Sequence, residues 1–174
     1  MVPTSSSALN EFNEQGYMVI PNVLDPEEDL QPVFNEYSEV LDRVIEHHSN
    51  GGDALIDLPF LDRMAKFIAA TGGTYYKHFE IRLPYEIVDE DTPIHLGAEI
   101  FALLRNPRLL DGIETFIGPE ISCNPVNVIR LKPPENLLPA GIEHAGIAST
   151  PWHQDLVNYP EEAENTDFLT VWVA

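Results

Sequence analysis

The stretch TPWHQDLVNY (residues 150–159) contains the pattern on which the predicted fold and function depend. Read as a β-strand, it places His153 and Asp155 on one face, because successive side chains of a strand point to opposite sides. Residues i and i+2 lie about 6.6 Å apart along a strand, so both side chains can converge on one metal ion. Imidazole and carboxylate are two of the three ligand groups of the facial sites that hold non-haem Fe(II). Taken alone, a His-x-Asp pattern is a weak signal for a metal site and is more often a hydrogen-bonded pair at a sheet edge.

The composition excludes several classes of function. Twenty-nine acidic residues against nine Lys and Arg give a formal net charge of −20, which repels phosphate backbones and anionic lipid. We therefore predict a small-molecule substrate and no nucleic-acid or membrane partner; the oligomeric state is left open. The chain has no apolar run of transmembrane length, and its start lacks the pattern of a secretory signal. The single Cys123 excludes an internal disulfide and favours a reducing compartment, so the sequence predicts a cytoplasmic protein.

Helical patterns dominate the first two thirds of the chain, and strand patterns the last third. Apolar spacing of three to four residues and capping residues predict helices at 7–17, 25–52, 58–73, 93–106 and 107–120. Within 25–52, Asp25 is the expected N-cap, Glu28 completes a capping box, and Pro32 predicts an interruption. Segments rich in β-branched residues predict strands at 17–24, 121–133, 151–156 and 168–174. This order favours an α+β fold in which helices pack on a sheet.

Several of these segments resemble, in order and spacing, the phytanoyl-CoA dioxygenase family of Fe(II)/2-oxoglutarate-dependent oxygenases. The specific part is NVIRLKPP (127–134), TPWHQDL (150–156) and FLTVWVA (168–174). Weaker support comes from FNEQGYMVIPNVLDPEE (12–28) and NPRLLDGIETFIGP (106–119). The resemblance implies N-terminal helices packed on a double-stranded β-helix, a cupin-like jelly-roll barrel, with residues 1–174 forming a single domain that lacks its C-terminal half.

The resemblance also implies a set of site residues. His153 and Asp155 match the first two iron ligands. Lys132 matches a position that contacts 2-oxoglutarate; an ammonium beside an apolar strand suits a dicarboxylate, although an exposed strand end is the alternative. Gln154 lies in the co-substrate stretch, but strand alternation turns its side chain away from the iron. Trp172 matches a residue lining the co-substrate pocket and is equally compatible with core packing.

The expected activity is that of a 2-oxoglutarate-dependent dioxygenase that hydroxylates a small organic or acyl-CoA-type substrate. Fe(II), 2-oxoglutarate and O2 are the expected cofactors and co-substrates, with ascorbate as reductant. The carboxylate of Asp155 favours hydroxylation over halogenation. Residues 156–174 contain no His, Arg or Lys, so the second histidine ligand and the arginine clamp are missing and these 174 residues by themselves are expected to be inactive. The alternative is a non-enzymatic jelly-roll binding module. Five histidines are expected to be structural or exposed: His47, His48, His78, His95 and His144.

Overall fold

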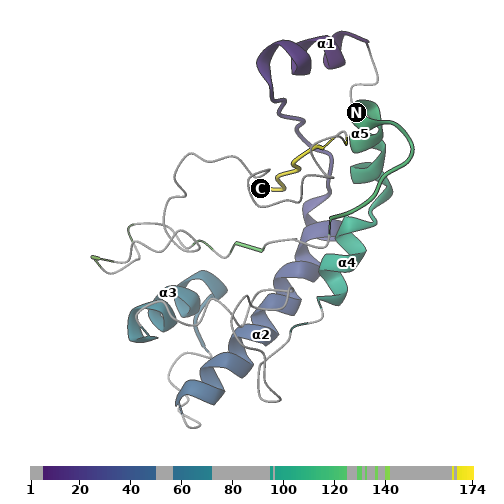
Figure 1. Cartoon of the computed structure of the whole chain (residues 1–174). Coiled ribbons are helices and arrows are strands. Elements are labelled where there is room, and N and C mark those ends of the chain that lie inside the picture. The colour runs from purple at the N-terminus through teal and green to yellow at the C-terminus, as the bar shows by residue number, and fades with distance from the viewer. Residues whose placement is uncertain are drawn as a thin grey trace. The chain divides into compact units, whose positions relative to one another are not determined.

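The computed structural model describes residues 6–49, 57–71, 95, 97–124, 129–130, 132, 136, 140–141, 166 and 168–174. The elements in these ranges are α1 (Ser6–Gln15), the π-helix η1 (Pro26–Leu30), α2 (Gln31–Ser49), α3 (Phe60–Thr71), α4 (Ala98–Leu104) and α5 (Pro107–Ile117) (Figure 1). The chain forms two compact units. Unit 1 comprises Met1–Pro32, Ala98–Cys123 and Trp152–Ala174, and unit 2 comprises Val33–Gly97 and Asn124–Pro151.

The predicted α+β fold with a jelly-roll barrel is wrong for the part of the chain that the structure describes. Helices make up 62% of these residues, and none of them lies in a strand, sheet or barrel. The predicted strands 17–24 and 168–174 fall wholly within the described ranges, where the backbone is irregular. Their β-branched and aromatic residues suit a half-buried pleated surface, but that preference depends on neighbours rather than on the backbone itself. Val19 and Trp172 are 79% and 76% exposed, so both segments lack the packing that stabilises a strand.

Of the two remaining predicted strands, the structure describes part of one and none of the other. In 121–133 the structure describes residues 121–124, 129–130 and 132, and none of these is in a strand. The strand predicted at 151–156, which carries the His-x-Asp pattern, lies outside the described residues.

The predicted helices are confirmed, with adjusted ends. Helix α1 ends at Gln15, two residues before the end of the predicted range, because Gly16 takes a φ of 78° in the left-handed region that side chains with a β-carbon resist. Helix α4 begins at Ala98 rather than near residue 93, since Gly97 has a φ of 62°. Helix α5 has Asn106 as its N-cap and Pro107 in the first turn, a position where the missing proline N–H costs nothing.

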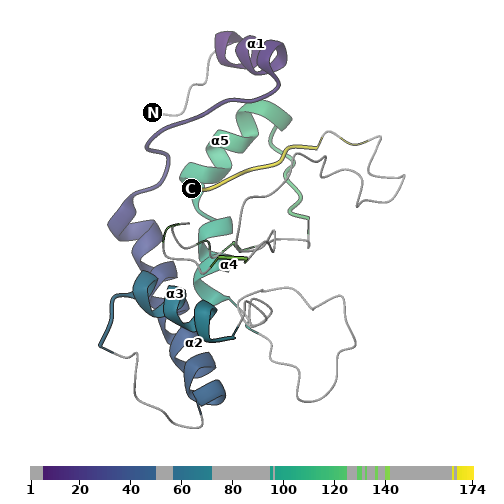
Figure 2. The same ribbon diagram turned by 90° about the vertical axis from the view of Figure 1, so that its left-hand side faces the viewer.

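Unit 2 is organised around the contact between α2 and α3 (Figure 2). The apolar faces of the two helices supply its core, since the side chains that α2 and α3 bury there are Tyr37, Val40, Leu41, Val44, Ile45, Met64, Ala65, Phe67 and Ile68. Burying one large apolar side chain stabilises a fold by about 1.5–3 kcal/mol. At one end of the contact, the rings of Phe34 and Phe60 meet edge to face at 6.5 Å. The 3.6-residue periodicity read from the sequence therefore identifies this core correctly.

Unit 1 contains a π-turn that explains how the chain accommodates Pro32. Asp25 caps η1 as predicted, because its Oδ1 accepts hydrogen bonds from the N–H groups of Glu27 and Glu28, both at 2.9 Å. In the reciprocal bond the Asp25 N–H donates to Asp29 Oδ2 at 2.6 Å, and not to the predicted Glu28 side chain. A π-turn inserts one residue relative to an α-turn, which moves the reciprocal position from the third to the fourth residue after the cap. The wider turn precedes Pro32, whose ring would clash with the carbonyl four residues earlier in a regular α-helix.

Asp29 also ties η1 to the start of α5 within unit 1. Its Oδ1 accepts a hydrogen bond from Asn106 Nδ2 at 2.7 Å, and its Oδ2 pairs with Arg108 Nη2 at 2.5 Å. Asn106 in turn caps α5 by accepting from the Arg108 N–H at 2.9 Å. Burial of the Asp29 carboxyl favours its neutral form, but the hydrogen bond from Asp25 and the hydrogen bond and charge of Arg108 outweigh this effect, so the pKa of Asp29 lies below its ordinary value.

We predict that Asp29→Ala lowers the free energy of unfolding by about 2 kcal/mol at neutral pH, because three donors lose a charged acceptor. Urea unfolding measures this difference, with the exposed Glu27→Ala as a control that should change stability by less than about 0.5 kcal/mol. A carboxyl whose pKa is depressed in the folded state stabilises the fold above its unfolded pKa of 3.8, and this contribution disappears as the pH falls through the lower folded value. The difference in unfolding free energy between wild type and Asp29→Ala should therefore disappear in acid. A difference that persists at low pH contradicts the stabilising role assigned to the Asp29 carboxylate.

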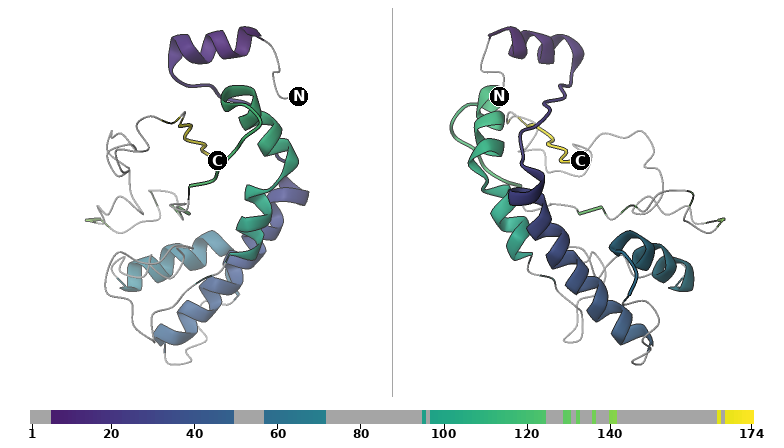
Figure 3. Two further views of the ribbon diagram at one scale, coloured as in Figure 1. Left: turned by 45° about the vertical axis from the view of Figure 1, so that its right-hand side comes forward. Right: turned by 180° about the vertical axis from the view of Figure 1, so that it is seen from behind.

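The remaining contacts of unit 1 join its helices. The rings of Phe12 in α1 and Phe116 in α5 lie 4.9 Å apart between centroids. Helix α4 leads directly into α5 (Figure 3). Among the helices that the structure describes, none combines the length and the apolar character needed to cross a membrane.

Candidate functional site

Three of the five predicted site residues cannot be placed. His153, Gln154 and Asp155 lie in the range 151–160, outside the described residues. Within the described residues, no group of three or more His, Cys, Asp or Glu side chains is arranged to hold a metal ion. The iron site therefore remains a prediction from the sequence.

Lys132, the predicted 2-oxoglutarate contact, belongs to unit 2 and is half-buried. Burial lowers the pKa of its ammonium group below the ordinary value, and the positive charge of Arg130 lowers it further.

Trp172, the other predicted co-substrate contact that the structure describes, belongs to unit 1 and is 76% exposed. It lies on the segment 168–174, in which Phe168, Val171 and Val173 are also exposed by a third or more. Lys132 and Trp172 thus belong to different units.

His95 has the structural role that the sequence predicts for it. Its Nε2 lies 3.0 Å from Glu36 Oε1, and both side chains are largely buried. Its ring meets the buried ring of Tyr37 edge to face, with 5.3 Å between centroids. These contacts hold the chain just before α4 against α2 within unit 2. His47 and His48 fall in the last turn of α2, and His78 and His144 lie outside the described residues.

A buried arginine is the polar feature that the sequence reading missed. Arg63 in α3 is only 5% exposed and pairs through Nη1 with Asp42 and through Nη2 with Ser38 Oγ, the latter at 2.5 Å. Its Nε is buried and has no hydrogen-bond acceptor. The position could have been found from periodicity, since Arg63 precedes the core residue Phe67 by four residues and so lies on the same face of α3.

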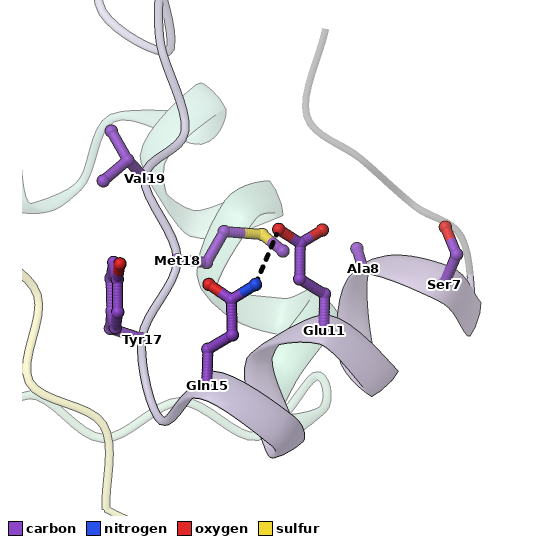
Figure 4. A pocket seen from close by; sticks show the side chains of 7 residues that line it. All are labelled: Ser7, Ala8, Glu11, Gln15, Tyr17, Met18 and Val19. Carbon is purple, nitrogen blue, oxygen red and sulfur yellow. Dashed lines mark hydrogen bonds between the residues drawn. The ribbon is translucent and has the colours of Figure 1, made fainter.

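A cavity of about 370 Å³ lies beside α1 in unit 1, lined by Ser7, Ala8, Glu11, Gln15, Tyr17, Met18 and Val19 (Figure 4). Gln15 Nε2 donates a hydrogen bond to Glu11 Oε1, one turn earlier in α1, at 3.4 Å. Among the residues that line the cavity, Glu11 supplies the one carboxylate and none is a histidine or cysteine, so these residues form no set of metal ligands.

The chain was compared with models of protein families, with curated proteins and with solved structures, and no match was found. Its function must therefore be inferred from its own residues.

Proposed function

We propose that this chain supplies the iron ligands His153 and Asp155 of an Fe(II)/2-oxoglutarate-dependent dioxygenase. The observation that carries the proposal is the sequence His-Gln-Asp in an otherwise apolar and aromatic stretch, with Lys132 ahead of it. Alternating imidazole and carboxylate donors suit Fe(II), whereas tetrahedral thiolate sites are excluded by the single cysteine of the chain. The donor set thus fits the metal that the proposed activity needs.

The proposed reaction oxidises a C–H bond of the substrate to C–OH and converts 2-oxoglutarate and O2 into succinate and CO2. Bound iron supplies the redox chemistry, and the protein supplies ligands, orientation and charge. His153 and Asp155 hold the metal, and the ammonium group of Lys132 attracts a carboxylate of the co-substrate. A small organic molecule or an acyl-CoA-type substrate fits this chemistry, and a carboxylate ligand at position 155 favours hydroxylation over halogenation.

Residues 156–174 do not supply the third metal ligand. They contain no histidine, and they contain no arginine or lysine to bind the second carboxylate of 2-oxoglutarate. Within this sequence His144, nine positions before His153, is the histidine closest to the pattern. The metal should therefore bind, but less tightly than in a complete three-ligand site.

Titration with Co(II), followed by its visible absorption, tests the proposal. Both His153→Ala and Asp155→Ala should weaken binding at least tenfold, because each removes one of two protein ligands. His48→Ala, which removes a histidine from the end of α2, serves as the matched control and should bind as wild type does. If both ligand variants bind Co(II) with wild-type affinity, the proposal is contradicted. If the metal binds but added 2-oxoglutarate leaves the Co(II) spectrum unchanged, a non-enzymatic metal-binding module replaces the enzyme.

A further inference from the structure

The cavity beside α1 in unit 1 combines a carboxylate, an aromatic ring and apolar side chains. Glu11 and Gln15 lie one turn apart on the same face of α1 (Figure 4). Tyr17, Met18 and Val19 come from the segment that follows the helix. The volume of about 370 Å³ falls within the range of small-molecule sites, roughly 300–1,000 Å³. The cavity can therefore hold a small organic molecule.

The carboxylate of Glu11 has no positive partner in the part of the chain that the structure describes. Gln15 donates to it at 3.4 Å, which is longer than the roughly 2.7–3.2 Å of most N–H···O hydrogen bonds. Residues 1–42 contain no lysine, arginine or histidine, so no neighbour along the chain balances its charge. A cation from outside the chain would meet a carboxylate that is accessible and only weakly bonded.

The lysine and arginine residues of unit 1 are engaged elsewhere. They are Arg105 and Arg108. The guanidinium carbon of Arg105 lies 5.4 Å from the centre of the Phe101 ring, and Arg108 pairs with Asp29. The chain as a whole has a formal net charge of −20, and a surface of one sign raises the local concentration of ions of the opposite sign. Both the local and the overall charge thus favour a positively charged ligand.

The other lining residues indicate that this cation is organic. Tyr17 is 63% exposed, and the face of an aromatic ring attracts an ammonium group. Val19, which is 79% exposed, and the half-buried Met18 offer apolar contacts for an alkyl chain. An inorganic divalent cation would need several oxygen ligands, whereas Glu11 supplies the one carboxylate of the lining. An ammonium group on a short alkyl chain matches all of these side chains.

We propose that the cavity beside α1 binds a small primary alkylamine in its ammonium form. Glu11 pairs with the ammonium group, the ring of Tyr17 adds a cation–π contact, and Met18 and Val19 contact the alkyl chain. This site lies within residues 7–19 and does not depend on the proposed iron site.

Titration with butylammonium chloride at constant ionic strength, followed by amide chemical shifts, tests the proposal. The shifts should concentrate in residues 7–19. Glu11→Gln should weaken binding about fivefold, and Tyr17→Leu about threefold, as expected for contacts that water partly screens. Glu14→Gln, which removes an exposed carboxylate of α1 that does not line the cavity, should bind as wild type does. Butanol and butyrate should bind the wild type at least fivefold more weakly than butylammonium, because neither carries a positive charge.

Three results would overturn the proposal. Butanol that binds as tightly as butylammonium would show that the charge is not recognised. Equal weakening in Glu11→Gln and Glu14→Gln would reveal general attraction of cations to an acidic surface. Amide shifts spread over the chain, or shifts reproduced by sodium chloride, would show that no defined site exists. The amide spectra also report whether each variant remains folded, and the comparison of ligands on the wild type stands without any variant.

Discussion

Replacing Asp42 by alanine should lower the free energy of unfolding by about 3 kcal/mol. Asp42 is the charged partner of Arg63, whose side chain is 6% exposed, and its loss leaves a buried guanidinium group without a counter-ion. Breaking a buried ion pair from one side costs about 3–5 kcal/mol. The lower end applies here because the Asp42 side chain is 44% exposed, so water can partly replace it. Urea unfolding followed by circular dichroism measures the change.

Two further variants separate the charge effect from damage to the helix. Glu39→Ala removes an exposed carboxylate from the same helix and should change stability by less than about 0.5 kcal/mol. The double variant Asp42→Ala with Arg63→Met should recover most of the lost stability, because an apolar side chain of similar length needs no counter-ion and leaves no unsatisfied Nε. An Asp42→Ala protein as stable as Glu39→Ala would show that the pair contributes nothing.

The helices could be predicted from the sequence because local information determines them. The apolar spacing in α2 and α3 specifies which faces are buried, and Asp25, Gly16 and Pro107 mark ends by backbone chemistry that needs no distant partner. The capping partner of Asp25 was misplaced by one residue, since a π-turn cannot be inferred from an α-helical spacing rule.

The strands could not be predicted in the same way, because a strand depends on a partner elsewhere in the chain. Segments 17–24 and 168–174 have the composition of strands, but composition does not show whether a neighbouring strand is present to accept and donate hydrogen bonds. Arg63 was missed for a related reason. A charged residue is normally assigned to the surface, and only the position of Asp42 one helix away makes its burial tolerable.

The candidate site depends both on a local sequence pattern and on contacts between distant parts of the chain. The pattern His153-x-Asp155 is local, so the sequence predicts a pair of ligands without reference to the rest of the fold. A complete site needs a third ligand and a carboxylate clamp from distant positions, which spacing alone cannot identify. The half-buried position of Lys132 could be learned only from the structure, since the sequence left an exposed strand end as the alternative.

Residues 1–174, supplied with Fe(II), ascorbate and 2-oxoglutarate, should release no succinate above the metal-free background. In the proposed function Lys132 is the residue of this chain that binds the dicarboxylate co-substrate, and His153 and Asp155 hold the metal loosely. Two protein ligands do not impose the facial geometry that leaves defined positions for co-substrate and O2. Binding without turnover is therefore the expected result, and it distinguishes a defect in the metal site from a defect in the dicarboxylate site.

Succinate can be quantified directly in assays with and without metal. The variant His144→Ala then shows whether His144 is a third metal ligand. If the wild-type chain releases succinate only when iron is present, a third protein ligand must lie within these 174 residues. His144 is the first candidate, because it precedes His153 by nine positions and residues 156–174 contain no histidine. Loss of that activity in His144→Ala, with calorimetric binding of 2-oxoglutarate retained, would assign the third ligand to His144. Activity retained in His144→Ala would direct the search to the remaining histidines, excluding His95, whose Nε2 is already committed to Glu36.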